Sequence, residues 1–183
     1  MSPSPERQPP GGFGLHFISF DEMILNNSFI DGSGVGNMYF GLAGDLNATT
    51  TFVQNFGGGI VMESLSGNLN LNNVTLDASG FIDVFAADTL SLSNSSLMPG
   101  DNFIYMQART VDLQNINFPA GSIVDLRSQF GMLAPNPNTS QPSLAGHVNF
   151  IQNVLYNGAP AQNEVPISQG GSGPGNAIQI STP

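Results

Sequence analysis

Asp83 and Asp125 are the two carboxylates in this sequence whose spacing best suits acid–base chemistry. Hydrolysis of a glycosidic bond requires two carboxyl groups roughly 5 to 10 Å apart across a groove. The two aspartates are separated by two copies of a 21-residue repeat, which places them on the order of 10 Å apart if successive copies stack as neighbouring strands. Ile104 falls between them, whereas a catalytic groove would supply polar and aromatic contacts to a sugar. We therefore expect no enzymatic activity and no catalytic residue.

Two glycine-rich turns, Asp31–Gly34 and Gly170–Gly173, are similar in composition to calcium-binding repeats. Those repeats need an aspartate at a fixed place every nine residues, and the sequence contains no such series. His16 and His147 are the two histidines, and no other ligand stands at metal-binding spacing beside either of them. We expect ordinary turns, no metal and no cofactor.

Four asparagines begin Asn-X-Ser/Thr sequons, which are glycosylated only in a eukaryotic secretory context. They are Asn47, Asn73, Asn94 and Asn138. Two of the four also occupy equivalent positions of the repeat, which favours coincidence over a glycosylation signal.

The stretch from Leu69 to Arg127 repeats itself every 21 residues without a gap. Apolar residues alternate with polar ones inside each copy, and this period of two predicts strands. A short strand cannot bury its apolar face alone, whereas stacked copies place equivalent side chains in columns that form a core. The columns are Leu69, Leu90 and Val111; Leu71, Leu92 and Leu113; Leu76, Leu97 and Phe118; Ile82, Phe103 and Val124; and Val84, Tyr105 and Leu126.

An asparagine stands at the same place in each copy, at Asn73, Asn94 and Asn115. Asparagine tolerates the left-handed conformation that a sharp bend between strands needs. Stacked amides also donate and accept hydrogen bonds along a column. We interpret this column as a structural ladder.

These patterns predict an all-β fold, namely a right-handed single-stranded parallel β-helix (a β-solenoid) with about 21 residues per turn and about six turns. The right hand follows from the strong preference of parallel crossovers. Imperfect earlier copies extend from Met23 to Phe40 and from Leu46 to Leu65. We expect a flexible Pro/Gly-rich segment at 1–12, then one domain over 13–183 with an N-terminal cap at 13–22 and insertions at 131–146 and 158–176.

The charge of the chain restricts its partners. Three arginines and no lysine stand against 13 acidic residues, for a formal net charge of −10. Such a surface repels phosphate groups and anionic lipids, so we expect no nucleic-acid partner and no attachment to an anionic membrane surface. No apolar run is long enough to span a membrane, so we expect no membrane insertion. The sequence has no cysteine and therefore no disulfide or thiolate site, and its first residues lack the apolar centre of a signal peptide.

The outward positions of the third strand are too apolar for a bare surface. They include Phe81, Phe85, Ile104, Met106 and Ile123. One interpretation is an interaction face, and the other is that the insertion at 131–146 or 158–176 lies over it. Because monomers seldom expose large apolar patches, the second interpretation is favoured.

The segments FIDVFAADTLSLSN (81–94) and IYMQARTVDLQNINFPAGSIVDLRSQFG (104–131) resemble repeats of filamentous-haemagglutinin-like exoproteins and autotransporter passenger domains. The resemblance covers residues 65 to 131 and extends loosely over 23 to 181. It implies a secreted or surface-exposed bacterial β-helix used for adhesion or display, and it carries no catalytic residues across. The export leader and the N-terminal secretion domain usual in such exoproteins are not recognisable in this sequence.

The sequence thus predicts a non-enzymatic structural or adhesive β-solenoid outside the cell, either a surface-exoprotein module or a filament-forming one. Its expected partners are further copies stacked end to end, as a homo-oligomer or filament, and a host-surface or glycan ligand. The alternative is a β-helix that binds carbohydrate or cleaves polysaccharide.

Overall fold

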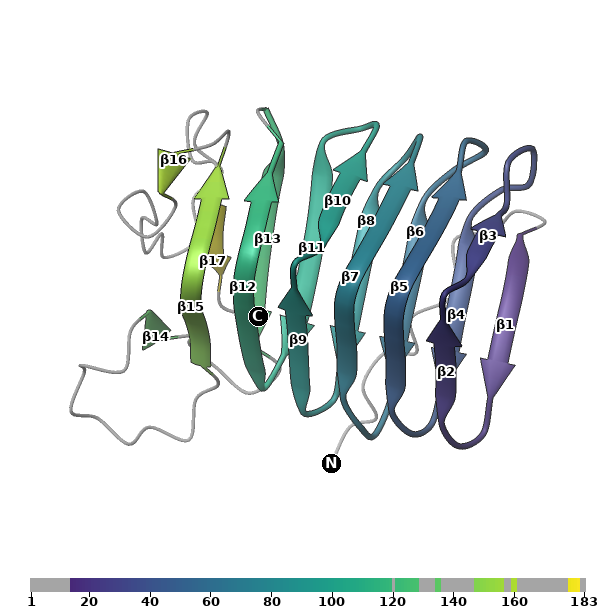
Figure 1. Ribbon diagram of the computed structural model, residues 1–183, viewed down its shortest axis with the longest axis horizontal. Coiled ribbons are helices and arrows are strands. Elements are labelled where there is room, and N and C mark those ends of the chain that lie inside the picture. Colours follow the sequence, from purple (N-terminus) through teal and green to yellow (C-terminus); the bar gives the residue numbers. More distant parts are fainter. Residues whose placement is uncertain are drawn as a thin grey trace, which may run out of the picture.

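Short β-strands that return to the same place once per turn build the described structure (Figure 1). The computed structural model describes residues 14–119, 121–128, 134–135, 147–156, 159–160 and 178–181. Strands of successive turns pair in parallel, and the described exception is the antiparallel pair of the two-residue β16 with β15. The chain is a β-solenoid of about five turns with a spacing of about 22 residues, as the sequence predicts in kind.

One side of the coil is a seven-stranded sheet. Its strands follow the order β1 (Leu15–Ser19), β4 (Met38–Leu42), β6 (Ile60–Ser64), β8 (Ile82–Ala86), β11 (Phe103–Ala108), β13 (Ile123–Ser128) and β17 (Ile178–Ser181).

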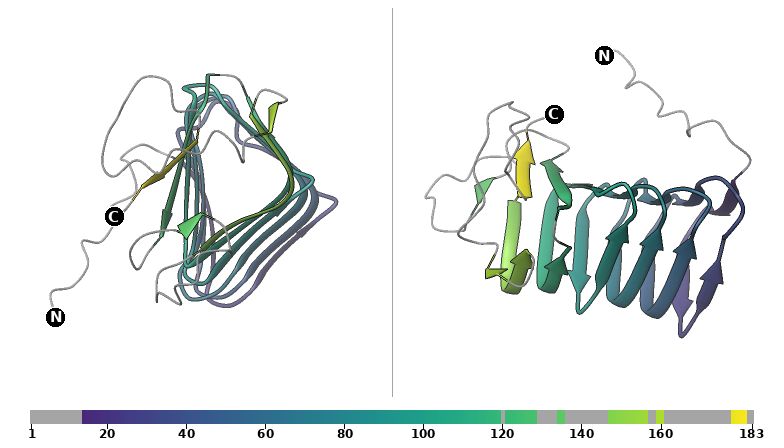
Figure 2. Two further views of the ribbon diagram at one scale, coloured as in Figure 1. Left: turned by 90° about the vertical axis from the view of Figure 1, so that its left-hand side faces the viewer. Right: turned by 90° about the horizontal axis from the view of Figure 1, so that it is seen from above.

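A ten-stranded sheet forms the rest of the coil. Its main path is β14 (Ala134–Pro135), β15 (His147–Tyr156), β12 (Thr110–Phe118), β9 (Thr89–Ser93), β7 (Leu69–Ala78), β5 (Leu46–Asn55) and β2 (Met23–Asn26). Beside this path, β3 (Phe29–Asp31) pairs with β5, β10 (Ser96–Pro99) pairs with β7, and β16 (Ala159–Pro160) pairs with β15. Seen along its long axis the coil has a three-sided outline, because the ten-stranded sheet bends into two arms (Figure 2).

The bend between the two arms lies at one residue in each turn, and that residue adopts a left-handed backbone conformation. The five bend residues have φ between 49° and 55°; they are Asn27, Thr50, Asn73, Asn94 and Asn115. Asparagine enters this conformation more readily than other side chains because its short amide bonds locally. The asparagine column therefore marks the corner of the solenoid.

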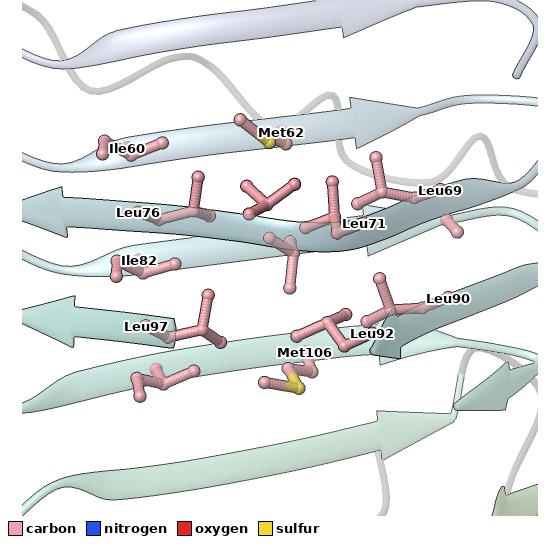
Figure 3. Close-up of a cluster of buried hydrophobic side chains, with 14 of the residues drawn as sticks. Ile60, Met62, Leu69, Leu71, Leu76, Ile82, Leu90, Leu92, Leu97 and Met106 are labelled. Carbon is pink, nitrogen blue, oxygen red and sulfur yellow. The ribbon is translucent and has the colours of Figure 1, made fainter. Parts of the chain in front are cut away.

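The core consists of columns of aliphatic side chains along the axis. Leu69, Leu71 and Leu76 of one turn lie beside Leu90, Leu92 and Leu97 of the next (Figure 3), and each is at most 1% exposed. Burying a leucine side chain contributes about 1.5–3 kcal/mol. The pattern of period two thus holds the turns together along the whole rod.

The seven-stranded sheet corrects one part of the expected register. Ile104 pairs with Ile82 and Met106 with Val84, and both Ile104 and Met106 are fully buried. The prediction that Phe103 occupies the core column was wrong. The turn before β11 holds one extra residue, at Asn102 with φ 67°, and the next turn is shorter by one, so Val124 follows Ile104 after 20 residues. A slip of one residue moves every side chain of a strand to the opposite face.

Two smaller expectations also meet the structure. β1 was expected to belong to a cap at 13–22, but it pairs with β4 over its whole length and forms the first strand of the coil. Phe56, expected in the core of the second copy, lies in a turn and is 57% exposed. The segment 1–12 lies outside the described residues, as do most of the insertions at 131–146 and 158–176.

Candidate functional site

The outer face of the seven-stranded sheet gathers carboxylates and aromatic rings, and we name it the acid–aromatic face. Parallel pairing in register aligns Tyr39 with Val61, Val61 with Asp83, Asp83 with Tyr105, and Tyr105 with Asp125. These residues alternate with core residues along each strand and therefore point away from the interior. The face consists of Tyr39, Val61, Glu63, Asp83, Phe85, Phe103, Tyr105 and Asp125.

The interaction face expected from the sequence differs from this one at its centre. Ile104 and Met106 were expected there, but they are fully buried in the core. The one-residue shift in register puts Phe103 and Tyr105 outside in their place. Three other expected members lie at the surface: Phe81 and Phe85 are partly buried, and Ile123 is 37% exposed.

Asp83 and Asp125 lie two strands apart in one column, as the repeat predicts, with Tyr105 between them instead of Ile104. At the usual spacing of strands their Cα atoms are roughly 10 Å apart. Asp125 is only 7% exposed and Asp83 is partly buried, and both side chains take part in interactions of their own. The objection that an apolar residue separates this pair was therefore wrong, since an aromatic hydroxyl stands there.

Tyr39 and Glu63 form a fixed polar pair on the same face. The Tyr39 hydroxyl donates a 2.8 Å hydrogen bond to Oε2 of Glu63. Burial of the phenol, followed by the hydrogen bond to Glu63, raises the pKa of Tyr39 to about 12. The ring lies across Gly41, where a Cβ atom would come within 2.3 Å of it. The absence of a side chain at Gly41 thus lets Tyr39 lean onto the neighbouring strand.

Aromatic rings continue along the face. Phe103 and Tyr105 are stacked, with ring centroids 6.0 Å apart and planes within 4° of each other. The Phe81 ring lies over Gly59, where a Cβ atom would collide with it at 2.8 Å. Because these rings support one another, the face presents a preformed surface instead of loose side chains.

A second surface feature lies at the bend of the ten-stranded sheet, near the N-terminal end. It is a shallow hollow of about 360 Å³. Phe29 and Phe52 stack along one side with ring centroids 5.5 Å apart. The remaining lining is hydroxyl and amide side chains, namely Asn27, Ser28, Thr50, Thr51, Asn73 and Thr75.

The asparagine ladder is broken at one step. Nδ2 of Asn115 donates a 2.9 Å hydrogen bond to Oδ1 of Asn94. Asn94 in turn donates to Oδ1 of Asn72 at 3.2 Å, whereas Asn73 donates to Oγ1 of Thr50 at 3.3 Å. Asn73 and Asn94 are exposed, so their backbone conformation matters more to the fold than amide bonds that compete with water.

The turns that resemble calcium repeats use their acid locally. Oδ1 of Asp31 accepts a 2.8 Å hydrogen bond from the Ser33 amide, and the hydrogen bonds of Ser33 lower the pKa of Asp31. The Gly170–Gly173 turn lies outside the described residues, as does Asn138 of the sequons. Within the described part of the chain, no group of three or more His, Asp or Glu side chains is placed to hold a metal ion. No described helix is long and apolar enough to cross a membrane.

Sequence reasoning missed Tyr39, Glu63, Phe103 and Tyr105 as members of the face. Phe103, Ile104, Tyr105 and Met106 are all apolar or aromatic, so the alternation inside the strand cannot say which pair is buried. The signal that was available is the turn Pro99–Asn102, whose Asn102 supports the left-handed conformation of an extra residue.

Known proteins give no further guide to this face: a scan against protein-family models and searches of curated proteins and of solved structures find no match.

Proposed function

We propose that this chain is a non-enzymatic structural and adhesive β-solenoid of the bacterial cell exterior, which binds its ligand through the acid–aromatic face. The rod holds that face on a sheet of continuous backbone pairing, with a fully buried core behind it. Binding sites are more exact when rigid elements carry them than when loops do. Such a module presents a surface without having to change shape.

The observation that carries the proposal is the column of Asp83, Tyr105 and Asp125. It alternates carboxylate, aromatic ring and carboxylate at successive strand positions along the axis. A ligand suited to this pattern combines apolar patches, which pack on rings, with hydroxyl groups, which donate hydrogen bonds to carboxylates. Saccharides have this combination along their whole length.

The charge of the chain narrows the class of saccharide. With a formal net charge of −10, the protein repels sulfated and uronic-acid polymers as it repels nucleic acid. The ligand class that we propose is a neutral oligosaccharide of a cell surface.

The test is calorimetric titration of the full chain with three soluble neutral probes: cellohexaose, mannohexaose and chitohexaose. We expect at least one to bind, and Tyr105→Ala to weaken that binding by about tenfold or more, as loss of a central aromatic contact does. The matched control is Phe56→Ala, because Phe56 is an exposed ring in a turn, outside the face. Failure of all three probes, or equal effects of the two substitutions, would contradict the proposal.

The same column supports one second candidate, which is cleavage of the polysaccharide. An inverting glycosidase separates its two carboxyl groups by about 6.5–9.5 Å, close to the separation expected for Asp83 and Asp125 two strands apart. The two functions differ in the product: release of reducing ends that Asp125→Asn abolishes would establish the cleaving enzyme. Binding without release of reducing ends favours the adhesive module.

A further inference from the structure

The first turn of the coil, made by β1, β2 and β3, differs from every later turn in how its core side chains are covered. Their counterparts one turn later are at most 1% exposed; these are Met38, Phe40, Leu46, Ala48 and Val53. The first-turn members themselves are only partly buried, and they are Leu15, Phe17, Met23, Leu25 and Ile30. Among the described residues, nothing lies over the end of the core.

The backbone of this turn is also open along one edge. β1 ends the seven-stranded sheet, while β2 ends the main path of the ten-stranded sheet and β3 pairs only with β5. Within the part of the chain that the structure describes, the outer N–H and C=O groups of these three strands meet no further strand. An open edge of this kind is a template for pairing with another strand.

Large apolar side chains surround the same end. Ile18 is 63% exposed, Phe20 93%, Ile24 57% and Phe29 65%, and all four belong to the first turn. Apolar side chains gathered in this way mark a site of association.

We propose that the first turn binds the first turn of a second copy of the chain, so that two solenoids join at their N-terminal ends. This inference is independent of the saccharide face. The occupant follows from the coil itself, because what covers each interior turn is another turn of the same pattern. Phe17 stacks on Phe40 at 4.7 Å and Phe29 on Phe52 at 5.5 Å, and a further turn extends both columns in the same way.

The opposite end of the rod explains why like ends meet. There β14 pairs with the start of β15, and β16 pairs with its end, so part of that edge is already occupied. A two-fold contact between N-terminal ends uses the open edge of both copies and closes at a dimer.

The two-fold axis also predicts the strand pairing between the copies. If the axis passes through Phe17, at the middle of β1, the two β1 strands run antiparallel and Ile18 faces the partner's His16. Such neighbours lie about 4.5–5.5 Å apart, which brings Ile18 of both copies within reach of a short cross-linker. In a head-to-tail contact the two Ile18 positions are instead separated by the length of the rod.

The first measurement is sedimentation velocity of the full chain from micromolar to millimolar concentration. We expect a monomer–dimer equilibrium that the double variant Ile18→Lys, Ile24→Lys weakens at least about tenfold. Both side chains are more than half exposed, so the substitutions leave the core intact. The matched control, Phe56→Lys with Leu65→Lys, changes two apolar side chains of similar exposure on interior turns and should dimerise like wild type.

The second measurement uses the lack of native cysteine. Ile18→Cys treated with a short bismaleimide should yield cross-linked dimers, and Ser66→Cys on an interior turn should yield none. A monomer at every concentration, oligomers that grow beyond the dimer, or a dimer unaffected by the end variants would overturn the proposal. None of these outcomes bears on saccharide binding, which is measured separately.

Discussion

Asn115 donates a 2.9 Å hydrogen bond from its side-chain amide to Oδ1 of Asn94 one turn away, and the two residues share a left-handed backbone with φ of 52° and 51°. This pair defines the corner where the ten-stranded sheet bends. Its two contributions, the amide bond and the backbone conformation, are separable by substitution.

We expect Asn94→Ala to lower the free energy of unfolding by about 1–2 kcal/mol, because alanine is disfavoured in the left-handed region. Asn94→Gly removes the same amide but enters that region freely, so it should stay within about half a kcal/mol of wild type. Urea denaturation of both variants measures the difference. Equal losses would show instead that the amide bonds hold the corner.

Thr50 occupies the bend position of its turn with φ 50°. A β-branched side chain in this conformation is strained, at a cost on the order of 1–3 kcal/mol. Thr50→Asn should therefore raise the free energy of unfolding by about 1 kcal/mol, and its amide oxygen would still accept the hydrogen bond from Asn73. Thr49→Asn, next to the bend and equally exposed, is the control that should not stabilise. A Thr50→Asn variant no more stable than wild type would contradict the strain.

Ile104 and Phe103 test the register of the seven-stranded sheet. Ile104→Ala removes a fully buried side chain and should cost about 2–5 kcal/mol. Phe103 is partly buried on the outer face, so Phe103→Ala should cost about 1 kcal/mol, even though it removes more atoms. Guanidinium denaturation compares the two. A larger loss for Phe103→Ala would return the sheet to the register expected from an unbroken repeat of 21 residues.

The phenol of Tyr39 predicts a loss of stability at high pH. Burial and the hydrogen bond to Glu63 raise its pKa in the folded protein to about 12, from an ordinary value of 10.0. The stabilising effect of the neutral phenol is therefore complete below pH 10 and is lost as pH rises from 10 to 12. Tyr39→Phe should flatten the stability profile in that window. The measurement is thermal unfolding across the pH series, and an unchanged slope in the variant would refute the assignment to Tyr39.

The repeat predicted the coil because its signal is redundant. Leu69, Leu90 and Val111 stand in one column and Leu71, Leu92 and Leu113 in the next, so each supports the reading of the others. All six are at most 1% exposed. The bend could be predicted in the same way, since only a few side chains enter the left-handed region and asparagine is one of them.

The acid–aromatic face could be predicted only in part. Asp83 and Asp125 share a column whether the intervening turn is long or short, because the extra residue before Phe103 is compensated in the next turn. The residue between the two aspartates depends on that single insertion. With four apolar or aromatic residues in succession from Phe103 to Met106, hydrophobic pattern alone does not fix which two face the core.

The most direct test of the binding face is a map of backbone amide chemical shifts during titration with the oligosaccharide that binds. We expect the perturbed amides to lie in β8, β11 and β13, centred on Tyr105, with little change in β7, β9 or β12 on the far side of the coil. Perturbations centred on the ten-stranded sheet, or none at saturating ligand, would contradict the assignment of the acid–aromatic face.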